Sequence, residues 1–472
     1  MTQLHDLTAL EQAAAVRRGE TSAFELVEHY AARIATHDAT VGAFVTLTLE
    51  TARQQARQAD ADVAAREELP PLHGVPIGIK DLNLVEGVPT RFGSVVYEGL
   101  AAPLSDSVVV KLREAGTISL GKTSTPEFGL PCYTEPDVAP PSRTPWDLGR
   151  SAGGSSGGAG AAVATGLLPF AQGSDGGGSI RIPASVNGLV GLKPARGRIS
   201  AGPVLGDLTG LATNGPISRT VRDAAVLLDA MAGPMPGDPH WAPPHTSSWL
   251  AECGRQPGRL RIGRYRDSPL ATSGVHPDVV AGYEAATALL VELGHDVEDI
   301  DSPFDASLLP VFETVWSVSA AGLPLDPARE AELRPLTRWL RERGRAATAV
   351  EFTSAMAAMQ LASRSAITST ARYDVVLTPT LAQLPAPIGW FIDAGDPRAE
   401  FDRMVGWTPF TAVCNTSGQP AISLPLHHTA EGLPVGVMLV GRPADEATLL
   451  RLAAQLEQAA PWSERRPGLW HA

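Results

Sequence analysis

A glycine-rich but partly apolar segment, residues 149–191, constrains the fold of this chain more than any other stretch. It holds 13 glycines and 6 serines among its 43 residues. A flexible linker of that composition would lack apolar runs, whereas this segment contains Ala161–Val163 and Leu167–Phe170. Glycine at this density within apolar sequence indicates a backbone that turns tightly, adopts positive φ or approaches another group closely. We therefore expect the segment to be packed within the fold.

Two serines of this segment lie beside consecutive glycines. Ser155 follows Gly153 and Gly154, and Ser179 follows residues 176–178, which are all glycine. A hydroxyl group in such surroundings can attack a carbonyl carbon while neighbouring N–H groups stabilise the oxyanion that forms. The pattern therefore suits nucleophilic acyl chemistry.

Two other interpretations of the segment fit less well. Residues 153–157 satisfy the G-x-S-x-G pattern of α/β-hydrolases, but that turn must follow directly on an apolar strand, and residues 144–150 indicate a loop. Phosphate-binding loops require G-x-x-x-x-G-K-[ST], or G-x-G-x-x-G between a strand and a helix, and the sequence has neither in that context. Both interpretations are disfavoured.

The charge balance excludes some classes of partner. The 472 residues carry a net charge of −13, with a pI near 5.4. Such a protein is poorly suited to bind nucleic acid or an anionic membrane surface by electrostatics. The amino terminus has no signal-peptide pattern, and no apolar run approaches the ~20 residues that span a bilayer. We expect a cytoplasmic protein.

The cysteines are few and scattered, at Cys132, Cys253 and Cys414. They predict neither a disulfide framework nor a zinc site, and a reducing compartment is expected. Cys132 has two interpretations, a catalytic thiol or a small residue that is buried or lines a pocket. The second is favoured because no partner for a thiol is apparent in the sequence.

Helical and strand patterns alternate along the whole chain. A capped helix over 105–116 leads into a strand over 117–121, and strands at 259–264 and 295–300 flank a helix over 278–294. Residues 305–372 look helical throughout, and strands are expected at 373–380, 421–424 and 435–440. The predicted fold class is α/β with a mixed sheet.

Lys80 lies at the end of a short apolar strand around Ile77 and Ile79. It could be a solvated strand end, which is the better expectation for an isolated lysine. It could also be a desolvated lysine whose lowered pKa lets it act as a base. The residues alone favour the first interpretation.

Several motifs follow one another over nearly the full chain: Gly78–Asp81, Gly121–Glu127, Gly153–Gly158, Gly173–Ala184, Gly188–Pro194 and Gly418–Pro425. Together, and in this order, they resemble the amidase signature family. The segments 134–136, 195–200 and 415–418 are most similar to the aminohexanoate cyclic-dimer hydrolases, and hydrolases of acyl hydrazides belong to the same family. One departure is Gly176, where the family usually has threonine.

The resemblance implies a catalytic triad. Ser179 would be the nucleophile, and Ser155, preceded by a cis peptide bond after Gly154, would relay the proton of Ser179. Lys80 would receive that proton, so it must be neutral and therefore buried away from carboxylates. No metal or cofactor is implied.

The resemblance also implies supporting groups. The backbone amides of Gly176, Gly177, Gly178 and Ser179 would form the oxyanion hole. The other supporting residues are Ser156, which could bond the loop or cap a helix, and Asp175 with Arg181, which would pair and hold the loop rigid. Candidate substrate-binding residues lie outside the signature: Phe128, Cys132, Tyr133, Trp316 and Trp407, with Phe410 nearby.

As a whole, the resemblance implies one domain over residues 1–472, a large mixed sheet with helices on both faces. Its core would span about 60–230 and 373–472, with a helical substrate-side insertion at about 300–372. The expected activity is hydrolysis of a small neutral carboxamide or acyl hydrazide, with a homodimer as a possible assembly. The rival is the A subunit of a tRNA-dependent glutamine amidotransferase, which would need partner subunits and act on glutamine.

Overall fold

A single mixed sheet of 11 strands runs through the part of the chain that the computed structural model describes, residues 3–65, 68–99, 101–204, 208–271 and 274–472. The strand order is β1-β3-β2-β4-β6-β5-β10-β11-β9-β7-β8. The strands are β1 (Phe44–Leu47), β2 (Pro76–Lys80), β3 (Ile118–Thr123), β4 (Phe170–Asp175), β5 (Val190–Lys193), β6 (Thr213–Ser218), β7 (Arg261–Arg264), β8 (Asp296–Asp299), β9 (Val375–Pro379), β10 (Ala421–His428) and β11 (Pro434–Gly441).

Both kinds of strand pairing occur in this sheet. Strand β2 runs parallel to β3 and β4, and β7 runs parallel to β8 and β9. The strands between them, from β4 through β6, β5, β10 and β11 to β9, pair antiparallel. The predicted α/β class with a mixed sheet is therefore confirmed.

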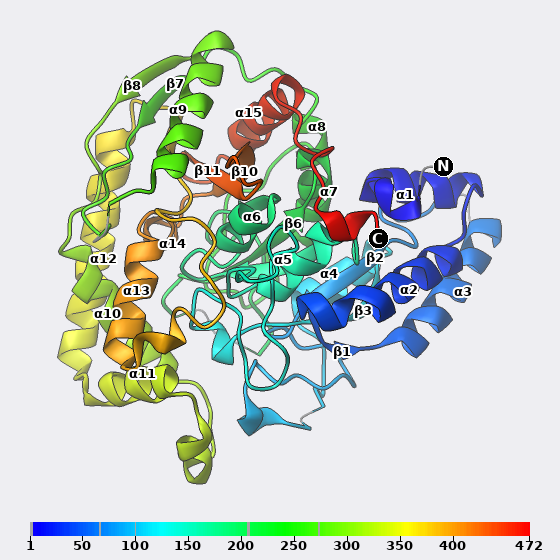
Figure 1. Cartoon of the computed structure of the whole chain (residues 1–472), viewed down its shortest axis with the longest axis horizontal. Helices are drawn as coiled ribbons and strands as arrows, with labels where there is room; N and C mark the ends of the chain where they lie inside the picture. Colours follow the sequence, from blue (N-terminus) through cyan, green and yellow to red (C-terminus); the bar gives the residue numbers. More distant parts are fainter. Residues whose placement is uncertain (1–2, 66–67, 100, 205–207, 272–273) are drawn as a thin grey trace.

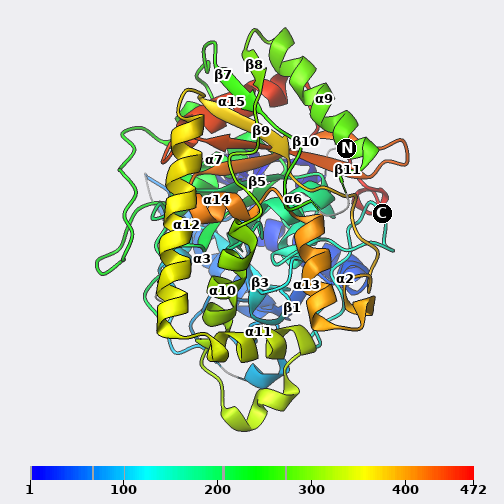
Figure 2. The same cartoon turned by 90° about the vertical axis from the view of Figure 1, so that its left-hand side faces the viewer.

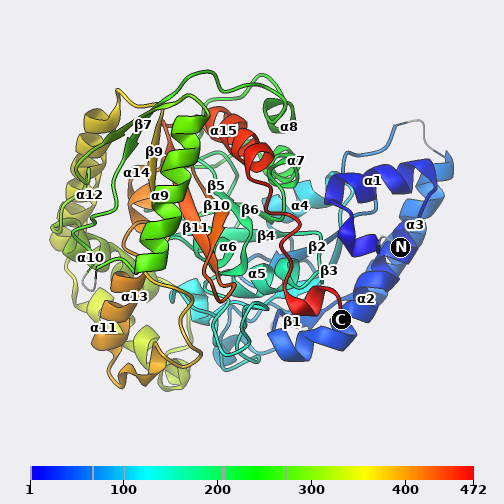
Figure 3. The same cartoon turned by 45° about the horizontal axis from the view of Figure 1, so that its top comes forward.

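Helices cover both faces of the sheet because its strands are apolar on both sides. In β9, Val375 and Leu377 join one buried cluster while Val376 joins another on the opposite side, as the two-residue repeat of a strand requires. The first face carries α1 (Ala9–Arg18), α4 (Ser107–Glu114), α7 (Val221–Met231), α8 (Trp249–Glu252), α9 (Pro277–Glu292) and α15 (Glu446–Ala459). Figure 3 shows α9 and α15 lying over this side of the sheet.

The opposite face carries the elements that form the site. They include α5 (Gly157–Ala164), α6 (Arg181–Asn187) and α14 (Ala412–Ser417), with α2 (Ala23–Val41) and α3 (Leu49–Ala65) at one end. At the other end stand α10 (Leu308–Ala321), α11 (Pro335–Ala346), α12 (Ala349–Thr370) and α13 (Pro397–Trp407). Figures 1 and 2 show these two helical groups on opposite sides of the molecule.

The segment expected to be wholly helical is interrupted. Between α10 and α11 the chain forms only a short 3-10 helix, Pro327–Glu332. Prolines 324, 327 and 335 explain the break, since each lacks a backbone N–H for a continuous helix. The sheet also extends beyond the expected core of 60–230 and 373–472, because β1, β7 and β8 belong to it.

An extra residue in β3 sets the orientation of its last side chains. Ile77 pairs with Ser119, but Gly78 pairs with Gly121, so Leu120 has no counterpart in β2. Side chains of paired residues point to the same face, and one extra residue reverses the alternation that follows it. Lys122, paired with Ile79, therefore points to the face opposite Lys80.

Among the described residues, no helix is both long enough and apolar enough to cross a membrane.

Candidate active site

Lys80 ends β2, and its side chain is fully buried. Its ammonium nitrogen Nζ lies 2.8 Å from Ser155 Oγ and 3.2 Å from the carbonyl oxygen of Ser174. Burial lowers the pKa of Lys80 to about 7, although the negative charge of Asp175 opposes this shift. A substantial fraction of this lysine is thus neutral near pH 7, so it can accept a proton from a hydroxyl group.

Ser155 lies in the turn that precedes α5, and the Gly154–Ser155 peptide bond is cis, as the resemblance implies. The turn is packed tightly against the segment that carries Tyr133. A Cβ atom on Gly154 would lie 2.6 Å from the backbone nitrogen of Tyr133, so only glycine fits there. The side chain of Ser155 is buried and faces Lys80.

Ser179 lies between the end of β4 and the start of α6 and borders a cavity. The described residues include no hydrogen bond between the hydroxyl groups of Ser179 and Ser155. The two loops are joined instead by the backbone N–H of Ser156, which donates to the carbonyl of Ser179 at 3.2 Å. The structure therefore joins Lys80 to Ser155 directly and holds Ser179 on the adjoining turn.

Asp175 and Arg181 form a buried ion pair below the loop that carries Ser179, and this is the pairing expected from the sequence. The two Asp175 carboxylate oxygens accept hydrogen bonds from Arg181 Nε and Nη2 at 3.0 and 2.9 Å, and both side chains are fully buried. Burial alone would raise the pKa of Asp175, but the Arg181 guanidinium holds it well below its usual range. The carboxylate also accepts from the backbone N–H of Gly178 and Ile180.

Only part of the predicted oxyanion hole is available in this arrangement. The N–H of Gly178 donates to Asp175 Oδ1 at 2.7 Å, so it is not free for a substrate. Within the described residues, the N–H groups of Gly176, Gly177 and Ser179 donate to no protein acceptor. Of these three residues, Gly177 and Ser179 border the cavity.

Ser156 bonds the neighbouring loop and does not cap α5. Its hydroxyl donates to the carbonyl of Ser174 at 3.2 Å and accepts from the N–H of Ser174 at 3.3 Å. Although Ser156 occupies the N-cap position of α5, its side chain makes no capping hydrogen bond. Of the two interpretations from the sequence, the loop contact is the one observed.

The cavity in front of Ser179 is predominantly apolar. Its lining includes Leu130, Ile182, Leu270, Leu308, Leu309, Phe312, Phe401, Met404, Val405 and Val413, with hydroxyl groups only from Ser179, Thr408 and Thr416. None of the described residues that line it is charged. About 720 Å³ of space is not filled by protein atoms, a volume that includes solvent at the open mouth.

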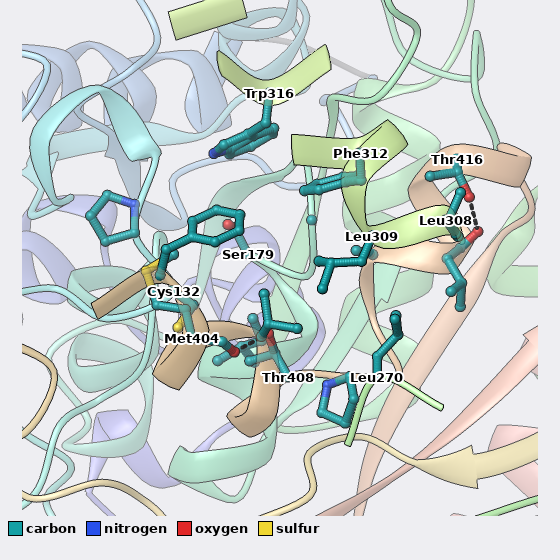
Figure 4. A pocket seen from close by; sticks show the side chains of 18 of the residues that line it. Cys132, Ser179, Leu270, Leu308, Leu309, Phe312, Trp316, Met404, Thr408 and Thr416 are labelled. Carbon is teal, nitrogen blue, oxygen red and sulfur yellow. Dashed lines mark hydrogen bonds between the residues drawn. The ribbon is translucent and has the colours of Figure 1, made fainter. Parts of the chain in front are cut away.

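Two of the five candidate substrate-binding residues border this cavity, Cys132 and Trp316. Trp316 stacks on Phe312, one helical turn away on α10, with ring centroids 5.4 Å apart. Figure 4 shows both rings on one side of Ser179, with Cys132 and Met404 across from them. Burial raises the pKa of the Cys132 thiol well above its ordinary value, which favours a pocket residue over a reactive thiolate.

The other three candidates do not line the cavity. Tyr133 stacks on Phe391 and donates its hydroxyl hydrogen to Glu400, and Trp407 is buried with its indole N–H bonded to the carbonyl of Leu384. Phe128 packs edge-on against Tyr97. Phe410, also considered from the sequence, is buried in the core. Sequence position near the site did not reveal that these rings are not part of the cavity lining.

Several residues that shape the site have no role predicted from the sequence. Asn415 donates to both the backbone carbonyl and the carboxylate of Asp175 at 2.9 Å and accepts from Arg181 at 2.8 Å. The Gln172 side chain accepts from the backbone N–H of Lys80 at 2.9 Å. Asn415 lies in segment 415–418, which is similar to the family, so the sequence marked this residue as important. The sequence did not predict its contacts with Asp175 and Arg181. Phe312 carried no such signal.

The chain is similar to known amidases over nearly its whole length. Residues 25–450 match the family model described as Amidase. A putative amidase of Synechocystis sp. is 38% identical, covering 99% of this chain and 91% of the relative. The 6-aminohexanoate-cyclic-dimer hydrolase of Paenarthrobacter ureafaciens is 37% identical, covering 98% of this chain and 96% of the relative.

A solved structure leads to the same family. The structure of a 6-aminohexanoate cyclic dimer hydrolase complexed with substrate superposes with a TM-score of 0.92 at 35% identity, covering 99% of this chain and 100% of that one. The match thus extends from α2 to α15 in sequence and over the whole sheet in structure. On these findings, the chain belongs to the amidase signature family of hydrolases.

Proposed function

We propose that this protein is an amidohydrolase that cleaves the C–N bond of a small neutral carboxamide or acyl hydrazide through an acyl-enzyme on Ser179. The observation that carries the proposal is the contact of 2.8 Å between Lys80 Nζ and Ser155 Oγ. It joins a fully buried lysine, whose hydrogen-bond acceptors are a hydroxyl and a carbonyl, to a serine beside the nucleophile loop.

In the proposed acylation, Ser179 Oγ attacks the substrate carbonyl carbon. Its proton passes to Ser155 Oγ, and the proton of Ser155 passes to the neutral amine of Lys80. When the C–N bond breaks, the leaving nitrogen takes up a proton through Ser155, which restores the neutral lysine. Water then hydrolyses the ester on Ser179 by the same proton relay and releases a carboxylate.

The N–H groups of Gly177 and Ser179 support stabilisation of the oxyanion. Both residues border the cavity, and neither N–H has a protein acceptor among the described residues. Removal of one oxyanion donor in enzymes of this kind costs about 10²–10³-fold in kcat. Two such donors therefore account for a large part of the catalysis that a Ser–Ser–Lys arrangement needs.

The lining of the cavity supports a neutral substrate. A charged group in this apolar pocket would lose its hydration without gaining a partner of opposite charge. Free glutamine carries two charges, so the cavity disfavours the amidotransferase-subunit alternative. A hydrazide fits as well as an amide, and its leaving group is easier to expel. We further propose that the protein acts in the cytoplasm without a partner subunit.

The test is turnover of aryl and aliphatic amides, the matching acyl hydrazides and glutamine by the purified protein. We expect activity on neutral substrates, and mass spectrometry of the quenched reaction should show the acyl group on Ser179. Ser179→Ala should abolish the adduct, and Lys80→Ala should slow its formation. Activity on glutamine alone would favour the amidotransferase subunit, and full activity in Ser179→Ala would refute the nucleophile.

A further inference from the structure

The peptide group between Gly177 and Gly178 is held at both of its polar ends. Its carbonyl oxygen, from Gly177, accepts a hydrogen bond from the hydroxyl of Thr411 at 2.7 Å. Its N–H, from Gly178, donates to Asp175 at 2.7 Å. Because the C=O and N–H of a trans peptide point in opposite directions, these two bonds fix the rotation of the peptide plane.

That orientation determines where the neighbouring N–H groups point. With the N–H of Gly178 directed back to Asp175, the amides on either side of it, from Gly177 and Ser179, are the ones left without a protein acceptor in the described structure. Both belong to residues that border the cavity. The plane of one peptide therefore decides which amides can meet a substrate oxygen.

Thr411 is itself rigidly placed. It is fully buried between α13 and α14, and its backbone carbonyl accepts from Arg181 Nη1 at 2.9 Å. Gly178, at φ +133°, lies directly against it, since a Cβ atom there would come within 2.4 Å of Thr411 Oγ1. A second acceptor for the hydroxyl, the carbonyl of Thr408, is more distant at 3.4 Å.

We propose that Thr411 is a positioning residue for oxyanion stabilisation: its hydroxyl holds the Gly177–Gly178 peptide so that the amides of Gly177 and Ser179 face the substrate carbonyl oxygen. Thr411 does not touch the reacting atoms and acts through the loop. This role rests on the proposed Ser179 mechanism. It adds to that mechanism a residue that lies 234 positions after Gly177, its hydrogen-bond partner.

The experiment compares Thr411→Val, which keeps the shape and removes the hydroxyl, with Thr411→Ser, which keeps the hydroxyl. Steady-state kinetics use the best substrate of the wild type. Binding is measured for a trifluoromethyl ketone carrying the same acyl group, because its adduct with Ser179 bears the oxyanion that the ground-state amide lacks. Thr117→Val is the matched control, since it removes another buried threonine hydroxyl, which is bonded to the carbonyl of Leu112 at 2.9 Å in the turn between α4 and β3.

We expect Thr411→Val to lower kcat about tenfold, less than outright loss of a donor would, with KM changed less than twofold. Affinity for the ketone should fall by the same factor as kcat, and Thr411→Ser should recover most of both. Thr117→Val should affect thermal unfolding only. If Thr411→Val unfolds, Thr411→Ala provides the comparison with Thr411→Ser.

A kcat within twofold of wild type in the variant that lacks the hydroxyl would overturn the role of Thr411, as would equal losses in the valine and serine variants. A fall in kcat without a matching loss of ketone affinity would also overturn it. These results differ from failure of the proposed function, in which the wild type itself would turn over no neutral amide or hydrazide and form no adduct.

Discussion

Lys80 and Lys122 are both buried lysines on neighbouring parallel strands, yet their ammonium groups have different hydrogen-bond partners. The Lys80 ammonium meets a hydroxyl and a carbonyl, whereas Lys122 Nζ meets the Asp81 carboxylate and the Thr90 hydroxyl, each at 3.0 Å. Burial lowers the pKa of both lysines, but only at Lys122 does a hydrogen-bonded carboxylate oppose the shift. The hydrogen-bond partner, and not the burial, therefore distinguishes Lys80, the proposed base, from Lys122, which is paired with a carboxylate.

The sheet keeps the two sites apart. Asp81 directly follows Lys80, and alternation along the strand sends their side chains to opposite faces. The extra residue Leu120 turns Lys122 to the Asp81 side, whereas an unbroken pattern from Ile118 would have sent it to the Lys80 side. The charge of Asp81 is thus neutralised on the far face, and Lys80 stays free of a hydrogen-bonded carboxylate.

The largest expected effect comes from removing the amine of Lys80. Lys80→Met keeps the length and apolar stem of the side chain but leaves Ser155 without a proton acceptor. We expect kcat/KM to fall by about 10³-fold, the usual range for loss of a general base, with little loss of stability because no buried charge is left unpaired. Kinetics and thermal unfolding measure the two quantities. A variant with more than a tenth of wild-type activity would show that another group accepts the proton.

The matching substitution at Lys122 should lower stability strongly and activity only slightly, the opposite of the result expected for Lys80→Met. Lys122→Met leaves Asp81 buried without its cation, which typically costs about 3–5 kcal/mol. We expect a lower midpoint in urea unfolding and kcat within severalfold of wild type for the protein that remains folded. The double variant with Asp81→Asn should recover part of the stability. A loss of kcat as large as that of Lys80→Met would contradict the division between the two faces.

The motifs in the sequence identified the candidate site residues but not the orientations of their side chains. Lys80, Ser155 and Ser179 lie in ordered motifs, so the motifs alone locate the candidate triad. The two interpretations of Lys80 could not be separated by its neighbours in sequence, because its burial depends on β4 and α5, about 75–95 residues further along, as its hydrogen bonds show. The local sequence pattern also could not reveal the extra residue in β3.

The cavity was less predictable than the triad. Its lining comes from separate segments around Leu130, Leu270, α10 and the α13–α14 region, and which side of each helix faces Ser179 depends on tertiary packing. Trp316 borders the cavity, whereas Trp407, an aromatic residue in an equally suitable segment, is buried with its indole N–H bonded to a backbone carbonyl. The hydrogen bond between Gly178 and Asp175 likewise required the folded loop.

A smaller effect, about thirtyfold between pH 5.5 and 8.5 for a base with a pKa of about 7, should come from pH. In the proposed mechanism the neutral form of Lys80 is the active one, and burial lowers the pKa of Lys80 to about 7. Activity should therefore rise as pH increases through about 7 and fall on the acid side, to roughly a tenth at one pH unit below the midpoint. In Lys122→Met the midpoint should move little, because Asp81 faces away from Lys80. A kcat/KM profile that is flat between pH 5.5 and 8.5 would contradict a titrating Lys80.

The smallest expected effect concerns the hydroxyl partner of Lys122. Thr90→Val removes one acceptor from the buried ammonium but leaves its ion pair with Asp81 in place, so the loss should be about 1 kcal/mol of unfolding free energy. Activity should be unchanged, since Thr90 lies on the side of the sheet away from Ser179.

The matched change, Ser155→Ala, removes the hydroxyl partner of Lys80 and should slow turnover about 10²-fold with no larger loss of stability. Equal effects of the two substitutions on kcat would mean that both lysines serve the chemistry. Unequal effects, with one seen in turnover and the other in unfolding, would assign catalysis to Lys80 and structural charge pairing to Lys122.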